Sequence, residues 1–533
     1  MTSHLSLSIK RFFSGTLLSR ISGMVRDLTM AFAFGDKPSV AAFMVAFRLS
    51  NLFRRLIGEG PFQSAFIPYF EGIRVEDPGK ATFFFQKLTS FVVIFLLSLI
   101  TLSEIGLWSA RSYFNISTGN LEIITLISWM LPGLLFICLY GLNISLLHCH
   151  DSFFIPSFAP FVCNAIWILG ALWLRSEEAN SAMLTLSKLI VIGFFGQWLM
   201  TLPLTLRYAS SHLKEWFSFK LPPEIKGLAQ AFSLGAIGVG AVQINAFVDA
   251  IFARYADLKG PIYLWYSIRL EQLALAIFGI ACVSTIVPRL SRAIKSGDNA
   301  TALSYFSFSF KRILAVMIPC TLAIFVLGGP SINLLYGRGL FSNFAVSQTT
   351  LCLWSYTLGL IPTTMVILFS ALFYARGDFR TPLMASLGAI LAHLVLNVFF
   401  VFGLGWGATS TALATSISAW CNFWILRHLS KKNGWESNYP LSKTVQLCFA
   451  STFAFCAALA AEYIFLHPVT FSFLFKQATI LPRHFTDQVM CFASPLVFFV
   501  VGLWSYATVS KNQDLLELFS EFSFRKKNVV TED

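Results

Sequence analysis

FFSGTLLSRISGMVRDLTMAFAF (residues 12–34) and AAFMVAFRLSNLFRRLI (residues 41–57) are two apolar stretches that carry basic side chains within them. These side chains are Arg20, Arg26, Arg48, Arg54 and Arg55. A charged side chain at the centre of a bilayer costs roughly 2.5–3.5 kcal/mol on insertion scales, so a cluster persists only where it faces water, a partner or an anionic ligand. The two stretches therefore predict a cationic interior within a membrane protein.

The composition of the whole chain supports this class. Of 533 residues, 56% are hydrophobic and 12% are charged, and the mean hydropathy is +0.69. Apolar runs of about 17–25 residues are long enough to span a bilayer as helices. We predict an all-α polytopic membrane protein of about fourteen transmembrane helices, near residues 12–34, 41–60, 84–108, 121–147, 153–174, 183–206, 227–253, 262–288, 311–329, 346–374, 382–404, 406–426, 444–465 and 487–508.

The net charge of +13 is distributed among short loops instead of one soluble surface, which argues against nucleic-acid binding. With the N-terminus placed in the cytoplasm, most Lys and Arg fall on the cytoplasmic side, as the positive-inside rule requires. We expect a multi-pass membrane protein with both termini cytoplasmic. The ten cysteines show no CxxC spacing, and no metal site is predicted.

Two parts of the sequence resemble each other at an offset of roughly 220 residues. Acidic, Arg-Leu and proline positions recur in the same order, pairing Asp27 with Asp249, Arg48-Leu49 with Arg269-Leu270, and Pro68 with Pro288. Long-period similarity of this kind is typical of duplicated transporter halves, which bring equivalent helices together at a central substrate site. We predict an N-lobe over 1–215, a C-lobe over 216–432, two further helices over 433–510 and a cytoplasmic basic tail over 511–533.

Small and polar residues form one stripe on the first segment. Ser19, Ser22, Gly23 and Arg26 recur at i, i+3, i+4 and i+7, with Arg20 about 100° from Ser19. We expect this stripe to face a polar cavity. The alternative is a tight helix contact with Arg26 extending to the interface.

The second segment repeats this spacing with Asn51, Arg54, Arg55 and Gly58, followed by Glu59. Arg55 and Glu59 form an i,i+4 pair, so Glu59 either neutralises Arg55 or serves as a gate that pairs across the cavity in one state only.

Three later segments carry further polar pairs. Arg269 is followed one turn later by Gln272, and Asn245 with Asp249 and His393 with Asn397 are i,i+4 pairs. Oxygen ligands on facing helices suit Na⁺ or a proton relay, and interhelical hydrogen bonding is the alternative.

The buried arginines outnumber the buried acids, so the expected cargo is an anion. The planar fork of arginine suits phosphate oxygens, and several forks could replace the hydration shell of a pyrophosphate. The sequence has no Walker A motif, and its carboxylates lack the clustering expected of a hydrolase. We therefore expect a transporter that is not an enzyme and that needs no bound cofactor.

SRISGMVRDLTMAFAFG followed by AAFMVAFRLSNLFRRLIGEGPFQSAFIPYF resembles the opening of the MurJ (MviN) lipid II flippases, within the multidrug/oligosaccharidyl-lipid/polysaccharide exporter superfamily. The resemblance recurs in YSIRLEQLALAIFGIACVSTIVPRLS and YARGDFRTPL. It implies a V-shaped fold of two six-helix lobes, alternating access, a cationic cavity for the lipid II headgroup and a lipid-tail groove at the last two helices. It also implies headgroup binding by Arg20, Arg26, Arg54 and Arg269, with Glu59 as the gate acid.

The chain departs from the family pattern at two positions. Ala41 and Ile268 stand where family members commonly have Asp. The countercharge of a cavity arginine has then moved, to Asp27 or Glu271, or gating and coupling differ. Among the family's sodium ligands, Asp249 is a match and Asn397 a weaker one.

The predicted function is translocation of lipid II from the inner to the outer leaflet, with its pyrophosphate on cavity arginines. The expected partners are lipid II, membrane lipids and cell-wall synthesis proteins. The alternatives are a flippase for another polyprenyl-linked glycan, a cation-coupled exporter on the same fold, a membrane enzyme of lipid-linked sugar metabolism and a scaffold for cell-wall assembly.

Overall fold

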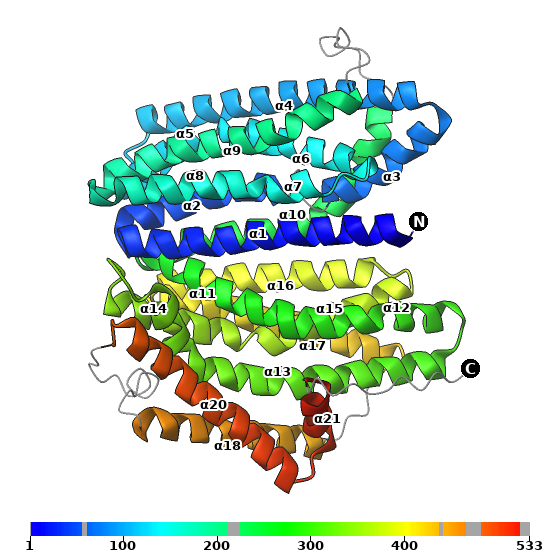
Figure 1. Cartoon of the computed structure of the whole chain (residues 1–533), viewed down its shortest axis with the longest axis vertical. Coiled ribbons are helices and arrows are strands. Elements are labelled where there is room, and N and C mark those ends of the chain that lie inside the picture. Colours follow the sequence, from blue (N-terminus) through cyan, green and yellow to red (C-terminus); the bar gives the residue numbers. More distant parts are fainter. Residues whose placement is uncertain (1, 56–60, 210–223, 436–440, 465–480, 523–533) are drawn as a thin grey trace. The chain divides into compact units, whose positions relative to one another are not determined.

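The structure is a computed structural model that describes residues 2–55, 61–209, 224–435, 441–464 and 481–522. Its regular structure within these ranges is helical (Figure 1). The helices are α1 (Thr2–Phe34), α2 (Pro38–Phe53), α3 (Pro61–Glu76), α4 (Pro78–Tyr113), α5 (Thr118–Met130), α6 (Gly133–Cys149), α7 (Phe154–Phe158), α8 (Pro160–Trp173), η2 (Leu174–Ser176), α9 (Ala179–Ala209), α10 (Glu224–Ala256), α11 (Gly260–Ala274), η4 (Leu275–Ile280), α12 (Ala281–Lys295), α13 (Asn299–Tyr336), α14 (Asn343–Thr357), α15 (Leu360–Ala375), α16 (Arg380–Val398), η5 (Phe399–Gly403), α17 (Thr409–Lys432), α18 (Leu441–Ile464), α20 (Phe485–Val509) and α21 (Gln513–Phe522).

Each apolar segment predicted from the sequence falls on one or more of these helices. Among the described residues, 9 helical segments are long and apolar enough to cross a membrane, and the α5–α6 pair, bent by 45°, would bring the number to 10. α2 has only 16 residues before the chain departs from α-helical geometry, which is short for a span on its own. The all-α membrane fold is therefore confirmed, and the count of fourteen spans stays a prediction.

The chain divides into two compact units, and the division comes later than the predicted lobe boundary at 215/216. The first unit contains Met1–Ile262 and Gly339–Phe341, and the second contains Tyr263–Arg338 and Ser342–Asp533. α10 belongs to the first unit because it packs on α2 and α3. A hydrogen bond of 2.5 Å from Arg48 Nη1 to the Ala246 carbonyl oxygen ties α2 to α10.

Local sequence signals explain where helices of the first unit begin and end. α1 ends where Gly35 takes φ +62°, a left-handed conformation that glycine adopts without steric cost, and α2 begins with Pro38 at its first turn. Asp77 caps α4 by accepting hydrogen bonds from the backbone N–H groups of Gly79 and Lys80. The core between α3, α4, α6 and α10 is rich in phenylalanine, including Phe62, Phe66, Phe70, Phe84 and Phe85.

The second unit has its core around α12, α13, α15 and α17. Phe369 contacts Phe306 and Phe423 edge-on, with ring centroids 5.2 and 5.8 Å apart. α18 and α20 form a pair that packs on α13. Their seam uses small residues, since a Cβ at Gly502 would lie 3.2 Å from the Ala454 Cα. Close approach of backbones at small residues is a general way for membrane helices to associate.

The predicted cytoplasmic basic tail over 511–533 begins within the described residues and stays a prediction. Its first part forms α21, which carries the acidic residues Asp514 and Glu517, and the basic run at 525–527 lies outside the described residues. Asp514 Oδ1 lies 2.5 Å from Lys311 Nζ of α13, so an ion pair holds α21 against the second unit.

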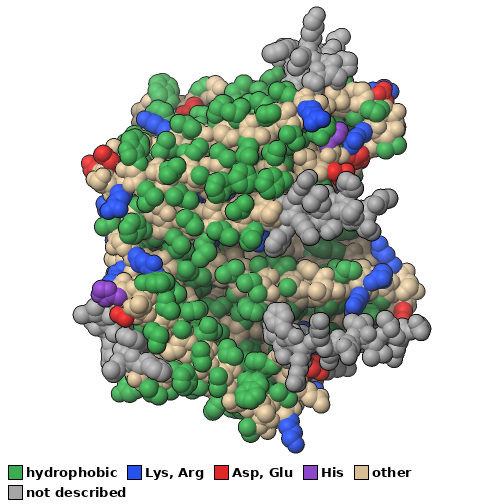
Figure 2. All heavy atoms as spheres, viewed as in Figure 1, with side chains coloured by type: hydrophobic (Ala, Val, Ile, Leu, Met, Phe, Trp, Pro, Cys, Tyr) green, Lys and Arg blue, Asp and Glu red, His purple; other side chains and the backbone are tan. Residues whose placement is uncertain are grey.

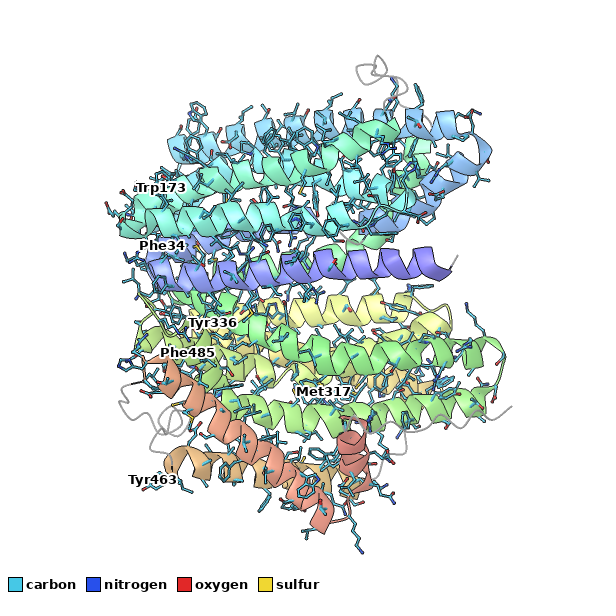
Figure 3. The ribbon with its side chains drawn as sticks, in the orientation of Figure 1. Phe34, Trp173, Met317, Tyr336, Tyr463 and Phe485 are labelled. Atoms are coloured by element: carbon cyan, nitrogen blue, oxygen red, sulfur yellow. The ribbon has the colours of Figure 1, made fainter. Side chains whose placement is uncertain are left out.

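The surface of the helices is mainly apolar. Figure 2 shows hydrophobic side chains over the middle of the helices and most charged side chains near their ends. On α4, Phe95 is 52% and Leu102 67% exposed. Figure 3 labels Phe34 and Trp173 at one end of α1 and α8, where Phe34 is buried and Trp173 is exposed. An exposed tryptophan at a helix end is typical of the membrane–water interface.

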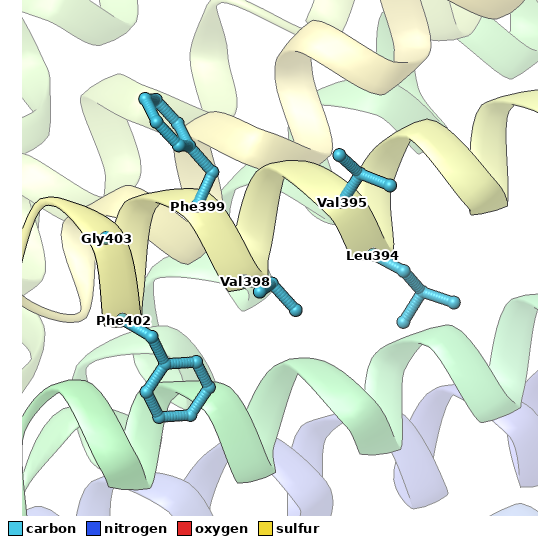
Figure 4. A pocket seen from close by; sticks show the side chains of 6 residues that line it. All are labelled: Leu394, Val395, Val398, Phe399, Phe402 and Gly403. Carbon is cyan, nitrogen blue, oxygen red and sulfur yellow. The ribbon is translucent and has the colours of Figure 1, made fainter.

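An apolar hollow of about 580 Å³ lies on α16 and η5 of the second unit. Leu394, Val398 and Phe402 follow one another at i,i+4 spacing along it, and Figure 4 shows them on the side opposite to Val395 and Phe399. This hollow is separate from the α18–α20 segment, for which the lipid-tail groove stays a prediction.

Candidate functional site

Arg26, in the middle of α1, is fixed by hydrogen bonds on two sides. Its Nε and Nη2 donate to Asp27 Oδ1 at 3.0 and 2.8 Å, and its Nη1 donates to Asn164 Oδ1 of α8 at 3.1 Å. The Asp27 side chain is 7% exposed and that of Arg26 is 12% exposed. Charge-assisted hydrogen bonds of this kind are stronger than neutral ones. A guanidinium has five N–H donors, and the contacts with described residues use three of them.

Trp167 of α8 completes this cluster. The Arg26 guanidinium carbon lies 4.6 Å from the centroid of the Trp167 ring, a cation–π contact. Trp167 is buried and packs edge-on against Phe43 and Phe47 of α2, with centroids 5.5 and 4.7 Å apart. We call Arg26, Asp27, Asn164 and Trp167 the α1–α8 cluster.

The stripe of small residues on α1 makes the helix contact that holds this cluster. Asn164 Nδ2 donates to Ser22 Oγ at 2.9 Å and to the Ser19 carbonyl oxygen at 3.3 Å. A Cβ at Gly23 would lie 3.8 Å from Asn164 Nδ2. The stripe therefore packs on α8 and orients Asn164 toward Arg26, which differs from the open polar face expected from the sequence.

Arg54, at the end of α2, is held by its own helix. Its Nε and Nη2 donate to Asn51 Oδ1 at 3.0 and 2.7 Å. Both Arg26 and Arg54 lie close enough to Cys163, one residue before Asn164 on α8, for their charges to reach its buried thiol. The predicted headgroup cations of the first two segments thus bring positive charge to one region of the first unit.

The other arginines of these segments differ in exposure. Arg48 is buried, and its bond to the α10 backbone gives it a structural role. Arg20 is exposed on α1, and Arg55 is partly buried next to Arg54. The predicted gate acid, Glu59, lies outside the described residues.

Arg269 belongs to the second unit. Its guanidinium carbon lies 4.7 Å from the centroid of the Trp265 ring, one turn earlier on α11. Glu271, considered above as a replacement countercharge, is buried, and Gln272 is exposed. Arg26 and Arg269 thus share one local feature, which is a guanidinium placed over a tryptophan ring.

The residues proposed for cation coupling fall in different units. Asn245 and Asp249 lie on α10 of the first unit, where Asp249 is buried and the buried Oδ1 of Asn245 accepts no hydrogen bond from described residues. Asn397 lies in the second unit, where its Nδ2 is 3.0 Å from His393 Nε2, and Thr415 Oγ1 is 3.3 Å from the same nitrogen. No group of three or more His, Cys, Asp or Glu in the described part of the chain is arranged to hold a metal ion.

Sequence reasoning missed Asn164 and Trp167. Both lie in an apolar helix, PFVCNAIWILGALW, at i,i+3 spacing. A lone asparagine in such a helix was the available signal, because a polar side chain within a membrane helix needs a partner.

Comparison with known proteins gives consistent results. The family model described as lipid II flippase MurJ matches residues 30–485. A probable lipid II flippase MurJ of Chlamydia pneumoniae is 31% identical over 97% of this chain and 94% of the relative. The solved structure of a lipid II flippase MurJ in an inward closed conformation has a TM-score of 0.71 at 22% identity, covering 93% of this chain and 98% of that one.

A more distant structure shows how far the fold extends. An inward-facing multidrug resistance MATE family transporter of the MOP superfamily has a TM-score of 0.60 at 14% identity, covering 80% of this chain and 98% of that one. With a family match over most of its length, a helical membrane fold and a buried cationic cluster, this chain belongs to the lipid II flippase MurJ family, whose members are transporters and not enzymes.

Proposed function

We propose that this chain translocates lipid II across the bacterial cytoplasmic membrane by alternating access, with the pyrophosphate of the headgroup bound by Arg26 and Arg54. The observation that carries this role is the α1–α8 cluster, in which a nearly buried guanidinium donates only three of its five N–H groups to described residues. Arg20 and Arg269 are the further cations proposed for the same headgroup. The polyprenyl chain stays in lipid, so only the polar headgroup crosses the bilayer.

The local geometry suits an anion that arrives and leaves. Asp27 neutralises Arg26 when no ligand is present, which limits the cost of holding a charge away from water. A pyrophosphate adds oxygens that Asp27 does not supply, and hydrogen bonds between arginine and phosphate are charge-assisted. The predominantly cationic character of these side chains disfavours the alternative of an exporter for cationic drugs.

The test is outer-leaflet exposure of lipid II in bacteria depleted of their own flippase and supplied with this chain. We expect the wild type to restore exposure and Arg26→Glu to fail, because a carboxylate repels the pyrophosphate. The double variant Arg26→Asp, Asp27→Arg keeps the ion pair but moves the cation by one position, about 100° around α1.

That double variant separates headgroup binding from a structural ion pair. Under the proposal it folds, as judged by thermal denaturation, and still fails to translocate. Full translocation by the double variant would show that only the pair matters and would rule out headgroup binding by Arg26.

We further propose that Asp249 and Asn245 bind the coupling cation, Na⁺ or H⁺. The unsatisfied oxygen of Asn245, one turn from a buried carboxylate, supports this role. Both termini are proposed to be cytoplasmic, and cell-wall synthesis proteins are the proposed protein partners.

A further inference from the structure

A pocket of about 1120 Å³ that contains two charged side chains, Arg254 and Glu122, lies within the first unit, at the end of α2 opposite to Arg54. It is bounded by the start of α2, the start of α5, the start of α9 and the end of α10, at the left-hand end of the blue-to-green helices in Figure 1. Along α2, at about 1.5 Å per residue, Ser39 of this pocket is roughly 22 Å from Arg54. The lining of the pocket includes neither Arg54 nor any residue of the α1–α8 cluster, so the pocket is a separate site.

One side of the pocket is cationic. Arg254 is 7% exposed, and its Nη1 donates to the carbonyl oxygens of Pro38, at 3.0 Å, and Leu258. Its Nε and Nη2 donate to no described residue, and Nη2 lies 3.3 Å from the position of a Cβ at Gly119. Gly119 is in the first turn of α5, where backbone N–H groups and the helix dipole favour an anion. The guanidinium of Arg254 and the backbone N–H groups at the start of α5 thus offer hydrogen-bond donors to the same part of the pocket.

The other side of the pocket is acidic. Glu122 is one turn further along α5, and it acts electrostatically on Arg254 without forming an ion pair with it. Its Oε1 is buried and accepts no hydrogen bond from the described residues. A buried carboxylate oxygen without a partner is costly, so a donor from a ligand would stabilise it.

The two sides have a definite spacing. From Thr118 to Glu122 the rise along α5 is about 6 Å. Two extended residues span at most about 7 Å, so the ends of a dipeptide reach both sides. The remaining lining mixes polar side chains, including Asn120, Asn180 and Ser181, with apolar ones such as Leu121 and Leu184.

We propose that this pocket binds the end of a short peptide, with the peptide carboxylate at Arg254 and the start of α5, and the peptide ammonium at Glu122. The same chemistry could be supplied by a free peptide, or by the peptide of the lipid-linked cargo through its carboxylate and an amino group on one of its side chains. The site is defined by its own residues and does not depend on headgroup binding at Arg26.

The first test is calorimetric titration of the purified full-length protein in nanodiscs with alanyl-alanine. We expect binding that weakens about tenfold or more when the probe is the C-terminal amide or the N-acetyl form, since each modification removes one charge. Equal binding of all three forms, or no binding at millimolar concentration, would overturn the proposal.

Glu122→Gln provides the sharper test, because it leaves the Arg254 bonds to Pro38 and Leu258 in place. This variant should bind the N-acetyl form as well as the unmodified dipeptide, and it should still discriminate against the amide. Lys259→Gln is the matched control, since Lys259 pairs with Asp36 at 2.8 Å at the same end of the unit and does not line the pocket. A Glu122→Gln protein with the wild-type preference would contradict the assignment.

Translocation assays then identify the source of the peptide. If Glu122→Gln slows translocation of intact lipid II but not of a precursor whose peptide has been removed, the pocket binds the peptide of the cargo. If the variant binds peptide as predicted and translocates both cargoes at the wild-type rate, the ligand is a free peptide. In both outcomes the dipeptide titration still decides whether the site exists.

Discussion

The segments α2–α3 and α11–η4–α12 contain the two copies of the repeat that the sequence indicates, and they differ in charge. Each copy has an arginine in its first helix, Arg48 or Arg269, and then a π-helical stretch, at Arg54–Arg55 or Leu275–Ile280. Each later helix contains an internal proline, Pro68 or Pro288. The π-helical stretches begin at corresponding positions of the repeat, which supports the duplication inferred from the sequence.

The pair of arginines in the π-helical stretch of the first copy has no counterpart in the second copy. Arg54 and Arg55 stand where the second copy has Leu275 and Ala276. Since both copies interrupt the α-helix, the interruption does not depend on the arginines. π-Helical segments within α-helices are frequent at functional sites. The comparison teaches that the repeat supplies the shape of the element and that the basic side chains of one copy supply its chemistry.

The largest effect on translocation is expected when Arg54 of the first copy is replaced by leucine, the residue at the corresponding position of the second copy. Arg54→Leu should lower translocation by about 10- to 100-fold, because a lost charge-assisted hydrogen bond is worth roughly 1.5–3 kcal/mol. Reconstituted flipping of labelled lipid II measures this, with Arg292→Leu, an exposed arginine of α12, as the control. Wild-type flipping by Arg54→Leu would remove the functional difference between the copies.

The corresponding arginines should differ in their effect on stability. Arg48→Ala should lower the free energy of unfolding by about 1–3 kcal/mol, because it removes a buried hydrogen bond to the Ala246 carbonyl. Arg269→Ala removes a cation–π contact with Trp265, worth about 0.5–1 kcal/mol when exposed. Thermal denaturation in detergent compares the two variants, and equal losses would mean that the arginines have kept one role.

A smaller difference is expected one turn after these arginines. Asn51 accepts two hydrogen bonds from Arg54, so Asn51→Ala should reduce translocation by about 3- to 10-fold by releasing that guanidinium, at roughly 1 kcal/mol. Gln272 is exposed in the second copy, and Gln272→Ala should change the rate less than about twofold. Flipping rates of the two variants, measured side by side, test this difference. A larger loss for Gln272→Ala than for Asn51→Ala would contradict it.

Hydropathy and helical spacing predicted much of this molecule. The apolar segments are helices, and the Ser19 to Arg26 stripe contacts Asn164 from one side of α1 because spacing along a helix fixes which side chains share a side. Which helix packs against this side of α1 could not be predicted in the same way. Asn164 is 138 residues from Arg26, and no local pattern states which helices meet.

Hydrogen bonds from side chains to backbone atoms could not be predicted from the sequence either. Arg48 looked like a cavity cation, yet its acceptor is the Ala246 carbonyl oxygen, a group that every residue carries. The same contact explains why α10 packs with the first unit, although the repeat assigned it to the second lobe. The folded structure is needed to show that Arg48 joins α2 to α10.

The pairing of Arg26 with Asp27 has a consequence for the electrical behaviour of the transport cycle. A unit charge that moves through 100 mV exchanges about 2.3 kcal/mol with the field. Adjacent opposite charges joined at 2.8 Å move together and carry no net charge, so the field does almost no work on them. Voltage sensitivity during return of the empty protein therefore has to come from residues other than this pair.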